Sequence, residues 1–131
     1  MIFSFNSNIS ELDRVFRTVT YFCKVNNISE ETICKLKLIV DEVVSNVINY
    51  AGISLKISIF ITKKNGDIKL KIIDSGKLFN PLLMRNPDVT LSLDDRKVGG
   101  LGIFLVKEYS KEIKYRRKDS KNILTVVLKI K

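Results

Sequence analysis

Residues 54–74 read SLKISIFITKKNGDIKLKIID and contain two runs in which apolar and polar residues alternate. Alternation with a period of two is typical of a β-strand that has one buried face and one solvated face. The segment KKNGD joins the two runs, and its Asn-Gly pair favours a tight hairpin turn because both central positions need a positive φ. We therefore expect an antiparallel hairpin with Lys56, Lys69 and Lys71 on its wet face.

The same alternation returns at both ends of the chain. MIFSFN at the N-terminus predicts a short first strand, and EIKYRR and NILTVVLKIK predict two more strands around a KDSKN turn. In the last strand the residues of one face are Leu124, Val126, Leu128 and Ile130, and those of the other face are Thr125, Val127 and Lys129.

Three segments have helical periodicity. With Ser10 as N-cap, apolar residues recur at helical spacing to about Asn26. Ser29 is the expected cap of a second helix, with acidic residues in its first turn. GGLGIFLVKEYS, residues 99–110, predicts a third helix behind a glycine-rich entry. The apolar face of the second helix consists of Ile33, Leu36, Val40, Val43, Val44, Val47 and Ala51.

The order of these elements is β-α-α-β-β-α-β-β. Because one face of the sheet is wet, the three helices have to share the other face. We therefore expect an α+β two-layer sandwich, with a mixed, mainly antiparallel sheet and three helices on one face. A length of 131 residues fits a single domain over residues 1–131.

Composition excludes several classes of function. The chain has no histidine, which rules out Ser-His-Asp and Cys-His catalysis and a phosphohistidine within this chain. Its net charge is +9, but the lysines are scattered singly rather than clustered, so we expect an acidic protein partner or simple solubility and no direct nucleic acid binding. No signal peptide and no apolar run of about 20 residues is present, so we expect a cytoplasmic protein without membrane contact.

Three segments carry candidate chemistry, and the first is the glycine-rich entry to the third helix. Gly99, Gly100 and Gly102 precede an apolar helix whose first N–H groups and partial positive charge suit a phosphate. Glycines at this position also fit a loop hinge or a close helix packing.

The second segment is DEVVSNVINYA, residues 41–51. At about 100° per residue, Glu42, Asn46 and Asn49 share a stripe of roughly 60° opposite the valines. A solvated helix surface would give the same pattern. Two asparagines in the middle of an exposed helix face are poor helix formers, however, which favours a functional role.

The third segment is IIDSGKLFNP, residues 72–81. Asp74 ends a strand and Gly76 follows one residue later. A carboxylate in this place can accept a hydrogen bond from an exocyclic amino group such as that of adenine. The alternative is an Asx turn that closes the strand.

Taken together, Glu-x-x-x-Asn, Asp-x-Gly-x-x-Phe-Asn-Pro and the glycine-rich helix entry resemble the nucleotide-binding family of gyrase, Hsp90, histidine kinases and MutL. Within that family the chain is most similar to the small anti-sigma-factor serine/threonine kinases. The resemblance spans essentially the whole chain. It implies a Bergerat-type ATP-binding fold with an ATP lid at about residues 77–98.

The resemblance also implies roles for individual residues. Glu42 matches the general base, Asn46 the ligand of Mg²⁺ between the phosphates, and Asp74 the carboxylate that reads the adenine amino group. Gly76 matches the glycine that gives the base room, and Thr125 the last-strand threonine that supports the aspartate. The remaining implied nucleotide contacts are Asn49, Arg96, Lys97, Gly100, Leu101 and Gly102.

The function implied is that of an ATP-dependent serine/threonine-protein kinase with Mg²⁺ as cofactor. Such a kinase phosphorylates an anti-sigma-factor antagonist protein, sequesters a sigma factor and forms a homodimer. The alternative that the sequence leaves open is a non-catalytic ATP-binding regulatory protein that binds a protein partner.

Overall fold

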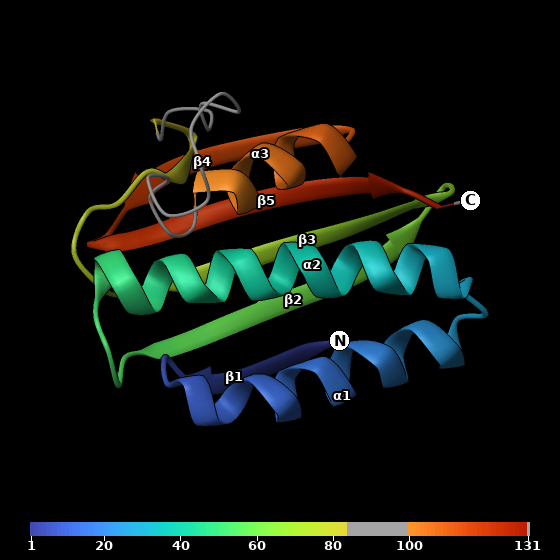
Figure 1. The fold of residues 1–131 in the computed structure, drawn as a ribbon, viewed down its shortest axis with the longest axis horizontal. Coiled ribbons are helices and arrows are strands. Elements are labelled where there is room, and N and C mark those ends of the chain that lie inside the picture. The colour runs from blue at the N-terminus through green and yellow to red at the C-terminus, as the bar shows by residue number, and fades with distance from the viewer. Residues whose placement is uncertain (84–99, 131) are drawn as a thin grey trace.

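The computed structural model describes residues 1–83 and 100–130. Its elements follow the expected order along the chain (Figure 1). The strands and helices are β1 (Ile2–Asn6), α1 (Leu12–Val25), α2 (Glu30–Asn46), β2 (Lys56–Lys64), β3 (Asp67–Asp74), α3 (Gly100–Tyr109), β4 (Glu112–Lys118) and β5 (Lys121–Lys129).

The five strands form one sheet in the order β1-β2-β3-β5-β4. Every pairing between the described strands is antiparallel. β2 and β3 form the expected hairpin, with positive φ angles of 53° at Asn65 and 79° at Gly66. Because β5 lies beside β3, the register places Asn122 opposite Asp74, which is 48 residues earlier in the sequence.

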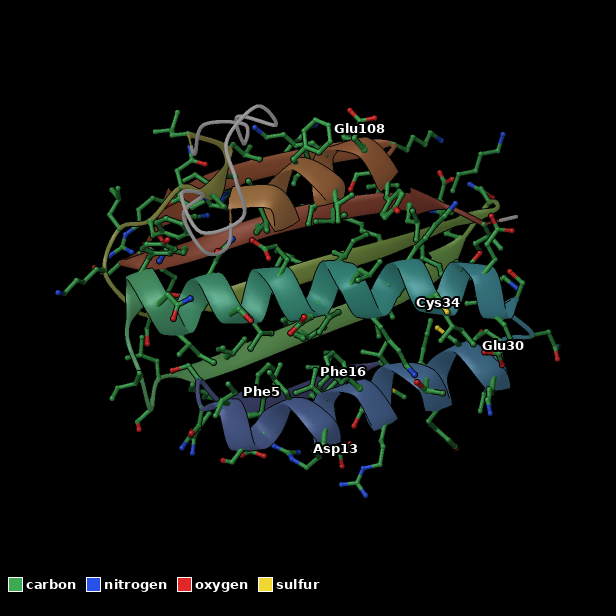
Figure 2. All side chains as sticks on the ribbon, viewed as in Figure 1. Phe5, Asp13, Phe16, Glu30, Cys34 and Glu108 are labelled. Carbon is green, nitrogen blue, oxygen red and sulfur yellow. The ribbon has the colours of Figure 1, made fainter. Side chains whose placement is uncertain are left out.

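The three helices cover one face of this sheet, so the predicted two-layer α+β architecture is confirmed (Figure 1). α2 lies between α1 and α3, and the predicted apolar face of α2 is buried in the core. On α1, Phe16 points toward α2, whereas Asp13 points away from it (Figure 2). None of the described helices is long and apolar enough to pass through a bilayer.

The two predicted helix caps have different outcomes. Ser29 caps α2, since its hydroxyl oxygen accepts a hydrogen bond from the backbone N–H of Thr32 at 3.3 Å. Ser10 was the wrong choice for α1, because it lies within a 3-10 turn, Ile9–Glu11, and the α-helix starts only at Leu12.

The end of α2 departs from regular helix geometry. After Asn46 the chain continues as a π-helical turn, η2 (Val47–Ala51). A π-turn is wider than an α-turn because its hydrogen bonds run from i to i+5. Residues after Asn46 are therefore rotated away from the positions that a continuous α-helix would give them.

Candidate functional site

Asp74, at the end of β3, is held by two hydrogen bonds to one of its oxygens. Its Oδ1 accepts from the backbone N–H of Gly76 at 2.9 Å and from the Nδ2 of Asn122 at 3.0 Å. The first bond is the Asx turn that was the structural alternative for this segment. Among the described residues nothing donates to Oδ2, so the buried carboxylate, 4% exposed, keeps one oxygen available as an acceptor.

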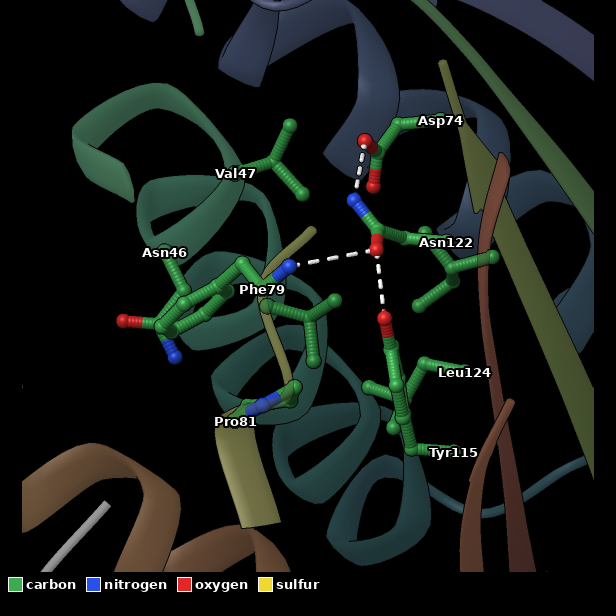
Figure 3. A pocket seen from close by; sticks show the side chains of 10 residues that line it. Asn46, Val47, Asp74, Phe79, Pro81, Tyr115, Asn122 and Leu124 are labelled. Carbon is green, nitrogen blue, oxygen red and sulfur yellow. Dashed lines mark hydrogen bonds between the residues drawn. The ribbon is translucent and has the colours of Figure 1, made fainter. Parts of the chain in front are cut away.

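Asn122, the second residue of β5, is the centre of this network (Figure 3). Its Nδ2 donates to Asp74 and, at 2.7 Å, to the carbonyl of Lys77. Its Oδ1 accepts from the backbone N–H of Phe79 at 3.2 Å, the hydroxyl of Tyr115 at 2.6 Å and the guanidinium of Arg117 at 3.1 Å. With both donors and the acceptor engaged, the orientation of the amide is determined.

Sequence reasoning missed Asn122, although a signal existed. Asn122 has the same phase of alternation as Leu124 and Val126, which face the core. A buried amide in an apolar phase must be hydrogen-bonded, and this marks it as a structural or functional residue.

A small pocket lies beside Asp74 and Asn122. Its volume is about 20 Å³, which holds water but is too small for a purine. Phe79 is one of its walls and stacks on Tyr50 with ring centroids 4.8 Å apart. A planar ligand of purine size would have to displace Phe79 or its neighbours in order to reach Asp74. The apolar walls are Val43, Val47, Ile72, Phe79, Pro81 and Leu124.

Gly76 is required for packing, which differs from the expected role of leaving room for a base. A Cβ at this position would lie 2.6 Å from the carbonyl oxygen of Ala51 and 2.7 Å from Cδ1 of Leu55. The adjacent N–H of Lys77 donates to the same Ala51 carbonyl at 3.0 Å. Gly76 therefore lets the chain after β3 lie directly against the π-turn.

Glu42 and Asn46 lie one helical turn apart on α2 and present buried polar atoms without partners. Asn46 is 2% exposed, and neither its Oδ1 nor its Nδ2 has a hydrogen-bond partner among the described residues. Oε1 of Glu42 is also buried and has no hydrogen-bond partner among the described residues. Unpartnered buried polar atoms are costly, so a pair of neighbouring residues with three of them indicates a binding site for a polar ligand or a cation.

The environment of Glu42 favours its protonated form. Burial raises the pKa of the Glu42 carboxyl above its ordinary value, and the negative charge of Asp41 raises it further. The nearby amide of Asn46 and the backbone N–H of Ile103 oppose this shift. The amide lies near enough to act electrostatically, although no hydrogen bond of normal geometry joins Asn46 to the carboxylate.

The start of α3 lies against Glu42. Gly100 is the first residue of the helix, and a Cβ at Gly102 would overlap the carboxylate of Glu42. Gly102 therefore allows close packing between α3 and α2, which is one of the roles expected for these glycines. The same contact brings the first turn of α3, whose N–H groups suit an anion, next to Glu42.

Two expected site residues lie elsewhere. Thr125 is on the outer face of the sheet, paired with Lys71 and Lys114, so it cannot support Asp74, which faces the helices. Asn49 lies in the π-turn and is exposed, because the wider turn rotates it away from the buried Asn46.

Part of the expected lid is described and part is not. Residues 77–83 are described and include a short 3-10 turn, Pro81–Leu83. Arg96, Lys97 and Gly99 lie outside the described residues. Gly100 and Leu101 are described only as the first residues of α3, and their expected contact with phosphate stays a prediction.

Two known structures share this arrangement of helices and strands. The RsbU and RsbW domains of Rv1364c from Mycobacterium tuberculosis match with a TM-score of 0.67 and 11% identity, over 99% of this chain and 31% of that chain. The catalytic domain of the histidine kinase ThkA matches with a TM-score of 0.54 and 14% identity, over 98% of this chain and 97% of that chain. Identities this low show a shared fold alone.

Sequence comparison is more specific. The chain is 30% identical over 94 residues to the serine/threonine-protein kinase BtrW of Bordetella bronchiseptica, which is 70% of this chain and 66% of BtrW. The match thus spans slightly less than two thirds of that relative. The model of the histidine kinase-like ATPase domain matches residues 5–128, nearly the full chain. The chain therefore belongs to the histidine kinase-like ATPase domain family.

Proposed function

We propose that this protein is an ATP-dependent serine/threonine-protein kinase of the anti-sigma-factor type. The observation that carries the proposal is the pair Glu42 and Asn46, whose buried polar atoms have no partner within residues 1–83 and 100–130, with Glu42 against the start of α3. Similarity to BtrW, which is named a serine/threonine-protein kinase, supports the same activity.

Asp74 is the proposed adenine contact. Its free Oδ2 is an acceptor, and the exocyclic amino group of adenine is a donor. Asn122 and Gly76 occupy Oδ1, so the carboxylate presents one oxygen in one direction. Guanine presents an acceptor oxygen at the corresponding position and would face a like partial charge. This site therefore favours adenine nucleotides.

Asn46 fits a magnesium ion. Mg²⁺ prefers oxygen ligands and keeps several waters, so a single amide oxygen together with phosphate oxygens is an adequate set. Oδ1 of Asn46 is buried and has no hydrogen-bond partner in the described part of the chain, as such a ligand should before the ion binds. When bound, the ion neutralises charge on the phosphates during transfer.

Glu42 is the proposed general base. A carboxylate whose pKa is raised by burial accepts a proton from a serine or threonine hydroxyl more readily than an ordinary surface glutamate. The contact between Glu42 and the first turn of α3 supports this role, because backbone amides at a helix start suit phosphates.

One observation favours the alternative, a non-catalytic ATP-binding regulator. In this structure the backbone of Gly102 packs closely against the Glu42 carboxylate, and the hollow that both residues line has a volume of only about 70 Å³. A protein that kept this contact in all states would bind nucleotide and a partner without transferring phosphate.

Labelled ATP separates the two functions. We expect the protein to transfer the γ-phosphate to a serine or threonine of an anti-sigma-factor antagonist, with a sigma factor as a further partner and a homodimer as the working form. Glu42→Gln should lower transfer by about 10²- to 10⁴-fold and leave ATP affinity nearly unchanged. Asp74→Ala should weaken ATP binding by about 10- to 150-fold. A stable complex with the antagonist and ATP, without any label on the antagonist, would support the regulator instead.

A further inference from the structure

The face of the sheet that the helices leave uncovered carries a concentration of positive charge. The register of the strands places nine basic side chains on this outer face and two acidic ones, Asp67 and Glu112. The basic residues are Lys56, Lys64, Lys69, Lys71, Lys114, Arg116, Lys118, Lys121 and Lys129.

This clustering corrects the expectation that the lysines are scattered. In the sequence they occur singly, but they share one phase of alternation on four neighbouring strands and so point to the same side. The outer face has seven more positive than negative side chains, compared with a net charge of +9 for the whole chain. Most of the net charge of the protein is therefore on one surface.

The two acidic residues of the outer face are already neutralised. Asp67 pairs with Lys111 at 2.8 Å and Glu112 with Lys114 at 2.6 Å. The hydrogen bond and charge of Lys114 lower the pKa of Glu112, with the charges of Lys69 and Lys111 adding to the effect. Lys69, Lys71 and Arg116 form no salt bridge with any described carboxylate and are available to a partner.

The outer face also carries aliphatic side chains, on either side of the row formed by Lys71, Thr125 and Lys114. Ile73 on β3 and Ile123 on β5 lie opposite each other and are half-buried, with Val127 farther along β5. A hollow of about 740 Å³ is lined by the half-buried Ile123, Thr125 and Val127, which we call its floor, and by the exposed Lys69 and Arg116, which we call its rim. An aliphatic floor inside a charged rim is the general plan of a protein interaction surface.

The chemistry of this surface selects among possible occupants. A second copy of the chain that packed through its own outer face would bring two strongly positive surfaces together. Like-charge repulsion disfavours this arrangement. Sheet surfaces that bind single-stranded RNA use exposed aromatic rings to stack the bases. On the described outer face the only aromatic side chain is Phe60, and it is half-buried.

We propose that the outer face of the sheet is a docking site for an acidic polypeptide segment that carries aliphatic side chains between its carboxylates. Lysines and Arg116 attract the segment, and the aliphatic floor packs its apolar side chains. The pocket beside Asp74 is on the opposite face of the sheet. Tyr115 on the edge strand β4 lines both hollows, but Asp74 and Asn122 line only the pocket on the helix side, so we expect docking here to leave the nucleotide site open.

A short fluorescent peptide of Glu, Leu and Ala, with its leucines along one side, is a suitable probe. Its affinity is measured by anisotropy at low and at physiological ionic strength. We expect binding that weakens with salt, and a loss of at least about tenfold in the double variant Lys69→Glu/Arg116→Glu. The control Lys24→Glu/Lys37→Glu makes the same change in net charge on the helix layer and should bind within about twofold of wild type.

The aliphatic floor is tested separately. Ile123→Thr keeps a β-branched residue in the strand and should weaken binding severalfold without altering the salt dependence. A peptide with Ser in place of Leu should bind the wild-type protein as weakly as the Leu peptide binds Ile123→Thr. Melting temperatures confirm folding, and ATP affinity, which should not change in Lys69→Glu/Arg116→Glu, separates this site from the nucleotide site.

Three outcomes would overturn the proposal. Equal losses in the outer-face and helix-layer variants would show that only the net charge matters. Equal binding of the Leu and Ser peptides would remove the role of the floor. Displacement of the peptide by polyuridine or by duplex DNA at much lower concentration than by unlabelled peptide would assign the surface to nucleic acid.

Discussion

Replacing Asn122 by Asp tests whether this amide holds Asp74 in place. The substitution keeps the Oδ1 acceptor that serves Phe79, Tyr115 and Arg117, but it exchanges Nδ2 for an oxygen that lies 3.0 Å from Asp74 Oδ1. The size of the side chain is unchanged. The hydrogen bonds that Nδ2 donates to Asp74 and to the carbonyl of Lys77 are lost, and a second carboxyl group stands beside the first.

The size of the effect follows from the distance. Two unit charges about 3 Å apart repel by about 5 kcal/mol at an effective dielectric constant of about 20. Arg117, at 3.1 Å from Oδ1 of Asn122, offsets part of this repulsion. The folded protein can also avoid it by keeping one proton between the two carboxyls, which raises the pKa of the pair above the unfolded value of about 4.

The pH dependence has a definite sign. A group whose pKa is raised on folding stabilises the protein below the unfolded pKa, and this stability is lost as the pH rises through the folded pKa. Near pH 4 a single O–H of the new carboxyl can replace the bond to Asp74 but not the bond to the Lys77 carbonyl, so we expect Asn122→Asp to be less stable than wild type there by only about 1 kcal/mol. As the pH rises to neutral it should lose about a further 2 to 4 kcal/mol relative to wild type.

Urea unfolding at a series of pH values measures this difference. Asn122→Leu is the matched control, because it removes all of the hydrogen bonds without adding a charge and should lose stability to a similar extent at every pH. If the free energy of unfolding changed with pH in the same way for the Asp and Leu variants, the two carboxyls would not interact. The assigned contact between Asn122 and Asp74 would then be wrong.

Three further substitutions test other parts of the site. Gly102→Ala should displace the flexible Glu42 carboxylate, so phosphotransfer should fall as far as in Glu42→Gln, while the stability measured by urea unfolding changes by less than about 1 kcal/mol because alanine is the better helix former. Gly76→Ala places a Cβ against the backbone oxygen of Ala51 and should cost about 1 to 3 kcal/mol, seen as a drop of several degrees in melting temperature. Glu42→Gln removes a carboxyl whose pKa is raised by burial, so its unfolding free energy should exceed that of wild type at neutral pH, and the gain should vanish below about pH 4.5.

Local patterns predicted most of the fold. The alternation in residues 54–74, the Asn-Gly turn and the Ser29 cap each depend on neighbouring residues, and each is present in the structure. Ser10 failed because the chain first makes a 3-10 turn, in which Glu11 pairs with Arg14. Such a turn has no distinct pattern in the sequence.

The site was harder to predict because it depends on register. Asp74 could be recognised at a strand end, but its partner Asn122 is known only once β5 is placed beside β3 in a particular alignment. Thr125 was assigned from the resemblance, against its own position in the alternation, which puts it with Lys129 on the wet face. The alternation was the more reliable guide at this position.

The distribution of charge on the surface also depends on the register of the strands. Single lysines in separate strands look unremarkable along the chain, and only the pairing of four strands shows that they share a surface. The outer-face cluster is thus a property of the sheet and not of any segment.

The π-turn at the end of α2 has a consequence for redesign of the protein. It turns Asn49 out to solvent, and it also brings the carbonyl of Ala51 to the N–H of Lys77. Deleting one residue from Val47–Ala51 would allow the α-helix to continue, returning Asn49 to the side of Glu42 and Asn46 but pulling Ala51 away from the chain after β3. The number of residues in this turn therefore determines both where Asn49 lies and whether Ala51 can bond to Lys77. A change of turn length cannot alter one without the other.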